Sequence, residues 1–131
     1  MKKILIAFIF ICSLGVSNLY GADPAYSIYT ALGFGYSPSS IRFSAHDIEA
    51  GLLAAGTNGA SIGAIKLFRS GSTFAGFGLA FRFTNAIGFH GSVGKSYEWL
   101  NWLRFRAELN AEAYTDSFTQ ANALIGLEFT W

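Results

Sequence analysis

The sequence has 131 residues, of which 52% are hydrophobic, 17% are aromatic and only 13% are charged. Soluble domains typically carry about 25% charged residues, so this composition argues against an ordinary soluble domain. The formal net charge is +1, so the sequence lacks the excess of basic residues that is typical of nucleic-acid-binding proteins. We therefore expect no nucleic-acid partner.

Residues 1–22 have the pattern of a secretory signal peptide. Two lysines follow Met1, an apolar run of about 13 residues comes next, and small and polar residues end the segment. The run is shorter than the ~20 residues of a membrane-spanning helix, which makes a retained anchor the less favoured reading. We expect cleavage after Gly21 or Ala22, which fit equally well, and a mature domain of residues 23–131.

The only cysteine, Cys12, lies inside this segment, so the mature domain has no disulfide, thiol nucleophile or thiolate metal ligand. Ile11 stands where a lipoprotein attachment site has a small residue, so we expect no lipid attachment. Without Lys2 and Lys3, seven Lys and Arg residues face eight Asp and Glu residues, a net charge of −1. No mature stretch has 18 consecutive apolar residues, so a membrane-spanning form has to be a closed barrel.

From residue 23 onward, apolar residues alternate with period two, which predicts strands rather than helices. Glycine, serine, asparagine and proline residues separate the alternating runs, as turns require. The expected strands are 26–36, two strands within 40–56, and then 60–70, 73–84, 86–98, 102–115 and 118–131.

The segment 40–56 changes phase near His46-Asp47. Ile41 and Phe43 occupy odd positions before this point, whereas Ile48 and the apolar residues after it occupy even positions. A turn here gives eight strands in all, and a bulge gives seven. Bacterial single-chain barrels have even strand numbers, so we predict a turn.

The segment 103–113 alternates most clearly, with leucine, phenylalanine and alanine on one face and arginine, glutamate and asparagine on the other. In a soluble sheet the apolar face would form the core, whereas in an outer-membrane barrel it contacts lipid and the polar face fills the interior. Charges in a narrow interior have to pair, because an isolated buried ion is very costly. By phase, the predicted interior polar network holds Arg42, Glu49, Lys66, Arg82, Arg104, Arg106, Glu108, Glu112 and Glu128, with His90, Asn110, Tyr114, Gln120 and Asn122.

The final segment favours the membrane interpretation. It alternates up to a terminal aromatic residue, and it resembles the C-terminal signal by which the assembly machinery recognises outer-membrane barrels. In that pattern a polar residue precedes a glycine by two positions, and hydrophobic positions ending in an aromatic follow. Gly126, Phe129 and Trp131 match it, whereas Leu124 stands at the polar position.

As a whole, residues 23–131 resemble the small eight-stranded outer-membrane barrels, the OmpX-like group and the membrane domain of OmpA-like proteins. The resemblance implies an all-β, up-and-down antiparallel transmembrane barrel, monomeric, with a structural or surface-interaction role in the bacterial outer membrane. It also implies outer-membrane lipid, lipopolysaccharide and the barrel-assembly machinery as partners. About 109 residues over eight strands leave only short connections, and so few strands enclose side chains rather than a wide pore.

Two alternatives to a structural role are open. His90 and Ser92 lie two residues apart on one strand face, similar to the His-x-Ser of outer-membrane lipid A deacylases, in which they act as base and nucleophile. Val93 stands where those enzymes have asparagine, and the phase points both residues inward, so we expect no enzymatic activity. A narrow ion or proton path is the other alternative. No cofactor or metal site is expected, because the adjacent His46 and Asp47 make no coordination set.

Overall fold

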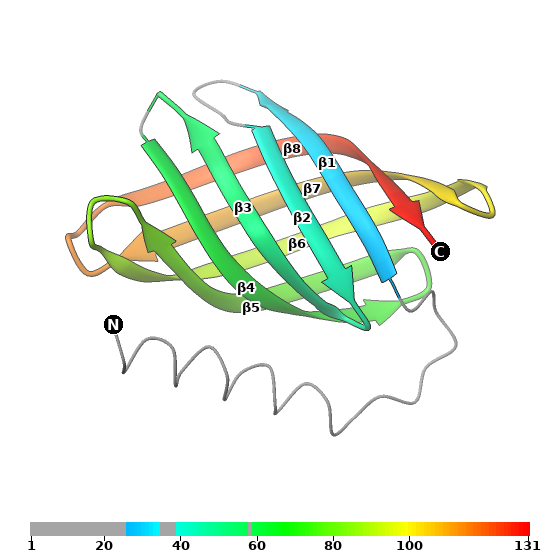
Figure 1. The fold of residues 1–131 in the computed structure, drawn as a ribbon, viewed down its shortest axis with the longest axis horizontal. Coiled ribbons are helices and arrows are strands. Elements are labelled where there is room, and N and C mark those ends of the chain that lie inside the picture. The colour runs from blue at the N-terminus through cyan, green and yellow to red at the C-terminus, as the bar shows by residue number, and fades with distance from the viewer. Residues whose placement is uncertain (1–25, 35–38, 58) are drawn as a thin grey trace.

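The computed structural model describes residues 26–34, 39–57 and 59–131, so the expected signal peptide lies outside the described residues. The described chain forms an all-β, closed antiparallel barrel in which each strand pairs with the next and β8 pairs with β1 (Figure 1). This confirms the predicted number and order of strands. They are β1 (Tyr26–Phe34), β2 (Ser39–Ala45), β3 (Ile48–Gly56), β4 (Gly59–Ser70), β5 (Thr73–Arg82), β6 (Ile87–Leu100), β7 (Leu103–Tyr114) and β8 (Thr119–Thr130).

The predicted turn at His46-Asp47 is confirmed. Ala45 ends β2 and pairs directly with Ile48, the first residue of β3, so two residues make the connection. His46 has a φ of 50°, in the left-handed region that tight turns between twisted strands often need.

A bulge also occurs, but farther along the chain than the predicted phase change. The register between β3 and β4 shifts between Leu52 and Ala54, and the intervening Leu53 is fully buried inside the barrel. An extra residue in one strand reverses the side-chain phase without ending the pairing. Segment 40–56 therefore holds both a turn and a bulge.

Strand β6 is longer than the alternation predicted and runs to Leu100. Its neighbour β5 begins at Thr73, which pairs with Lys95, so residues 97–100 of β6 extend beyond β5. On its other side β6 keeps pairing with β7 up to Leu100 and Leu103. The β6–β7 hairpin therefore projects past the neighbouring turn.

The barrel has two distinct ends. The first, called here the Trp131 end, carries the start of β1, the end of β8 and the turns 46–47, 71–72 and 101–102. The second, called the Asp116 end, carries the connections 83–86 and 115–118. The front strands β1–β4 cross the direction of the back strands β5–β8, as strands tilted in a small barrel do (Figure 1).

Inward-facing side chains fill the barrel. Tyr29 and Leu124 meet on one wall, and Ile65, Leu67 and Phe74 form a second apolar cluster on the other. Between these clusters the interior is polar and charged. An eight-stranded barrel is just wide enough for such side chains, so they occupy the space that a wider barrel would leave open.

Candidate functional site

Arg106 of β7 lies at the centre of the buried polar network. Its Nη1 donates to Glu49 Oε2 at 2.8 Å and its Nη2 donates to Glu108 Oε2 at 2.6 Å. The guanidinium also lies between two aromatic rings, 4.1 Å from the Tyr29 centroid and 4.2 Å from the Phe74 centroid. A delocalised planar cation suits this place, because it stacks on aromatic faces while its edge donates to carboxylates.

Arg42 forms the second ion pair of the centre. Its Nη1 donates to Glu108 Oε2 at 3.1 Å, and its Nη2 lies 2.9 Å from Glu108 Oε1. Its Nε donates to the Ser40 hydroxyl at 2.9 Å. Both charged side chains are fully buried, and they belong to β2 and β7, which are not neighbours in the sheet. The pair therefore connects two separate walls across the interior.

Glu128 of β8 brings in a cation that the sequence analysis missed. Arg69 Nη2 donates to Glu128 Oε1 at 3.0 Å, and Ser27 donates to the same oxygen at 3.1 Å. The predicted interior cation of this strand, Lys66, is instead on the outer face, because it pairs in register with the outward-facing Phe77. Both faces of β4 are rich in apolar residues, so alternation alone did not give its phase.

A second polar group surrounds Glu112 of β7. Its oxygens accept hydrogen bonds from Tyr114 at 2.7 Å, from Gln120 at 2.5 Å and from Ser61 at 3.2 Å. His90 Nδ1 lies 2.9 Å from Glu112 Oε1. Because an ionised carboxylate only accepts, Nδ1 is the nitrogen that carries the hydrogen. The side chains of β4, β6, β7 and β8 thus converge on one carboxylate.

Two arginines of the predicted network lie at the rims rather than at the centre. Arg82 donates to Asp116 at 3.0 Å and covers the Phe118 ring at 3.8 Å from its centroid, at the Asp116 end. Arg104 lies 3.7 Å from Glu98 at the Trp131 end. The register places Arg104 opposite Glu128, and Glu128 also lies 3.0 Å from Arg69 and 4.0 Å from Arg106.

His90 and Ser92 lie inside the barrel, on one face of β6, and both are buried. Glu112 lies beside His90 as the orienting carboxylate lies beside the histidine base in serine hydrolases. The Ser92 hydroxyl and His90 Nε2 each have no hydrogen-bond partner among the described residues, so the two are not bonded to each other. The link between base and nucleophile that activates a serine is therefore missing here.

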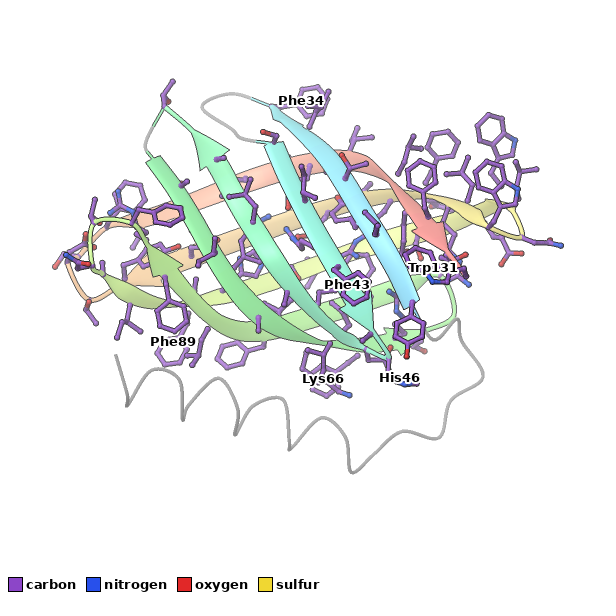
Figure 2. All side chains as sticks on the ribbon, in the orientation of Figure 1. Phe34, Phe43, His46, Lys66, Phe89 and Trp131 are labelled. Atoms are coloured by element: carbon purple, nitrogen blue, oxygen red, sulfur yellow. The ribbon has the colours of Figure 1, made fainter. Side chains whose placement is uncertain are left out.

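The outer face of the barrel is mostly apolar, with large exposed hydrophobic side chains on every strand except β3. Leu32 is 73% exposed and Leu109 is 62% exposed, and Figure 2 shows Phe34, Phe43 and Phe89 projecting from the outside of the barrel. Soluble monomers rarely expose continuous apolar patches beyond a few hundred Å². The other large hydrophobic side chains exposed in the strands are Tyr26, Ile28, Ile41, Ile62, Phe68, Phe77, Ile87, Val93, Tyr97, Trp99, Leu100, Phe105 and Ile125.

Aromatic side chains gather on the outside at the Trp131 end. Trp131 stacks with Tyr26, with ring centroids 6.5 Å apart. Trp102 stacks on Phe129 at 6.2 Å, and Trp99 stacks on Phe105 at 5.1 Å. Amphipathic rings in such a band are typical of a membrane–water interface.

The three residues that match the assembly signal lie on or directly after β8, in different surroundings. Phe129 and Trp131 belong to the aromatic band on the outside. Gly126 instead lies against β1, where an added Cβ would lie 2.7 Å from the Ala31 Cβ and 2.2 Å from the Thr30 carbonyl oxygen. A glycine at this position therefore permits close packing of β8 on β1.

Comparisons with protein-family models, curated proteins and solved structures gave no match. Within the described ranges no group of three or more His, Cys, Asp or Glu residues is placed to hold a metal ion. The described part of the chain also has no helix that is long and apolar enough to cross a membrane.

Proposed function

We propose that the protein is an integral outer-membrane β-barrel with a structural or surface-interaction role, closed by its own polar interior. The observation that carries this proposal is the inversion of polarity. Fully buried arginines and glutamates occupy the inside, while leucine, phenylalanine and isoleucine cover the outside. A soluble barrel has the opposite arrangement, whereas a lipid-embedded barrel needs this one.

The closed sheet supports the membrane setting. β8 pairs with β1, and Trp131 and Tyr26 exchange backbone hydrogen bonds at 3.1 and 3.3 Å. Lipid provides no partners for backbone groups, so only closed barrels and helices cross it. In this proposal the Trp131 end faces the periplasm, and outer-membrane lipid and lipopolysaccharide surround a monomer that the barrel-assembly machinery inserts.

The same interior supports a non-enzymatic role with no wide pore. Ion pairs connect walls that are not adjacent, as Arg42 and Glu108 do. The Ser92 hydroxyl has no bonded base and is buried inside, away from any lipid substrate. We therefore assign the buried charges to the stability of the barrel.

Migration on gels tests the membrane proposal. Outer-membrane fractions that contain the protein should show a fast folded band without heating and a slower unfolded band after boiling. The folded band should also stay with the membrane through an alkaline carbonate wash. Recovery of the protein in the soluble periplasmic fraction, or its release by carbonate, would contradict the proposal.

A further inference from the structure

The basic residues divide by type between the two faces of the barrel. From residue 26 onward the sequence has five arginines and two lysines. All five arginines are on the inner face or its rims, where each has a carboxylate partner, as Arg69 has in Glu128. The two lysines, Lys66 and Lys95, are on the outer face. They are the only charged side chains on the outer face of the described strands.

The two lysines lie on the strands that flank β5, toward one end of the barrel. Lys66 of β4 pairs with Ile48, the first residue of β3, and Lys95 of β6 pairs with Thr73, the first residue of β5. Both therefore lie toward the turns of the Trp131 end; Figure 2 shows Lys66 on the outside near His46. They flank β5 but are level with different residues of it, Phe77 and Thr73, so two inter-strand spacings and four residues of strand, roughly 16 Å in all, separate their backbones.

A small side chain lies on the surface between the two lysines. On β5 the outward position between the levels of the two lysines is Ala75, whose partners across the sheet are Phe68 and Val93. Thr73 is the next outward residue toward the turn, and it is exposed. A short alanine side chain therefore lies between two lysines, with the Thr73 hydroxyl toward the turn and apolar side chains on either side.

Neither lysine has an ion pair with a carboxylate within the described residues. An unpaired cation on a lipid-facing wall is destabilising at mid-bilayer, and the cost falls toward the interface. A lysine reduces it by extending its flexible stem toward the headgroups. Two such stems on either side of Ala75 would bring both amines to one point of the interface.

We propose that Lys66 and Lys95 hold the phosphate of an anionic phospholipid on the outside of β5, with its acyl chains lying along Ala75 and Phe77. This site rests on the proposed membrane function. The class of ligand follows from charge, because two amines without a carboxylate partner call for an anion, and the apolar border calls for acyl chains. The position near the Trp131 end favours a phospholipid of the periplasmic leaflet over lipopolysaccharide.

Native mass spectrometry of the detergent-purified barrel tests the site. The protein is mixed with phosphatidylglycerol, phosphatidylcholine or lipopolysaccharide, and retained lipid is measured for the wild type, for Lys66→Gln/Lys95→Gln and for Lys66→Arg/Lys95→Arg. We expect the wild type to retain phosphatidylglycerol in preference to phosphatidylcholine. The affinity of the double glutamine variant for phosphatidylglycerol should be roughly thirtyfold lower, because each basic residue contributes about fivefold at an anionic surface. The double arginine variant should keep most of the affinity.

The remaining outcomes each contradict a stated part of the proposal. Equal retention of the two phospholipids by the wild type, or unchanged binding by the glutamine pair, would overturn the phosphate site. Retention of lipopolysaccharide alone would overturn the choice of leaflet. Heat-modifiable migration of all three proteins in phosphatidylcholine vesicles serves as the folding control. Failure of every variant and of the wild type to insert there would instead contradict the membrane function itself.

Discussion

The charged residues of the interior differ in how much their ion pairs should contribute to the stability of the barrel. Arg106 has two carboxylates within 2.8 Å and is fully buried, whereas Arg104 at the rim lies 3.7 Å from the exposed Glu98 and is itself partly exposed. Breaking a buried pair leaves an uncompensated charge, while exposed pairs contribute about 0–1 kcal/mol. The buried pairs should therefore dominate the energetics.

Replacement of Arg106 by leucine tests this difference. The change removes the cation that lies 2.8 Å from Glu49 and leaves this buried carboxylate charged, so it should lower the free energy of unfolding by about 3–5 kcal/mol, measured by urea titration in vesicles. The double replacement Arg106→Leu/Glu49→Leu should cost less than Arg106→Leu alone. Arg104→Leu serves as the rim control and should cost about 1 kcal/mol or less. A double variant with a lower free energy of unfolding than either Arg106→Leu or Glu49→Leu would contradict the pairing.

Two glycines on neighbouring strands, Gly78 facing the interior and Gly91 facing outward, test how tightly the interior is packed. An added Cβ at Gly78 of β5 would lie 2.6 Å from the Ile65 Cα, whereas one at Gly91 of β6 would meet nothing within 4 Å. Gly78→Ala should therefore destabilise the barrel by about 1–3 kcal/mol through overpacking, and Gly91→Ala should leave the urea midpoint nearly unchanged. Equal changes in the urea midpoint for the two variants would mean that the close packing of Gly78 against β4 does not limit the stability of the barrel.

Among the strands, β7 separates the two environments most completely. Leu109 is on its outer face and Asn110 is buried on its inner face. Leu109→Arg should cost about 2–4 kcal/mol of folding free energy in bilayers, because the cation enters lipid. Leu109→Phe, measured in the same vesicles, should be nearly neutral. Undisturbed folding of Leu109→Arg would mean that this face does not contact lipid.

The last strand allows a test of assembly. Trp131 exchanges backbone hydrogen bonds with Tyr26 and completes the aromatic band. Its deletion should lower the amount of folded barrel in the outer membrane, measured as the heat-modifiable fraction. Trp131→Phe is the control and should retain most of it, since an aromatic residue stays in place. Full insertion of the shortened chain would contradict a role of Trp131 in assembly.

Most of the elements could be predicted because period-two alternation and turn residues are local signals. β7 and β8 each lie within one residue of their predicted ends. The phase of β4 could not be found, since Ile65 and Phe68 put apolar residues on both of its faces, although small Ser61 and Gly63 share the inward phase of Arg69. The partner of each charge could not be found either. Those contacts cross the interior between non-adjacent strands, so they depend on the tilt and stagger of the whole barrel.

At the scale of the whole molecule, the crossing ion pairs predict how the barrel behaves electrically. Arg42 and Glu108 join β2 to β7, and Arg69 and Glu128 join β4 to β8, so charged side chains span the interior. We expect no steady single-channel currents from the purified protein in planar bilayers. Arg42→Ala/Arg69→Ala is the comparison in which leak currents should appear if those side chains are the obstruction. Large, steady openings of the wild type would contradict a closed interior.

The division of basic residues between the faces also bears on proteolysis. Trypsin cuts after lysine and arginine, and from residue 26 onward the chain offers it seven such positions. Five are arginines on the inner face or rims, each paired with a carboxylate, and the two lysines are on the wall that we assign to lipid. All seven lie within hydrogen-bonded strands, whose extended backbone a protease cannot enter without opening the sheet. The same chain is thus a ready substrate when unfolded and a poor one when closed, so the quality control of a cell envelope could distinguish failed barrels from finished ones by trypsin-like cleavage alone.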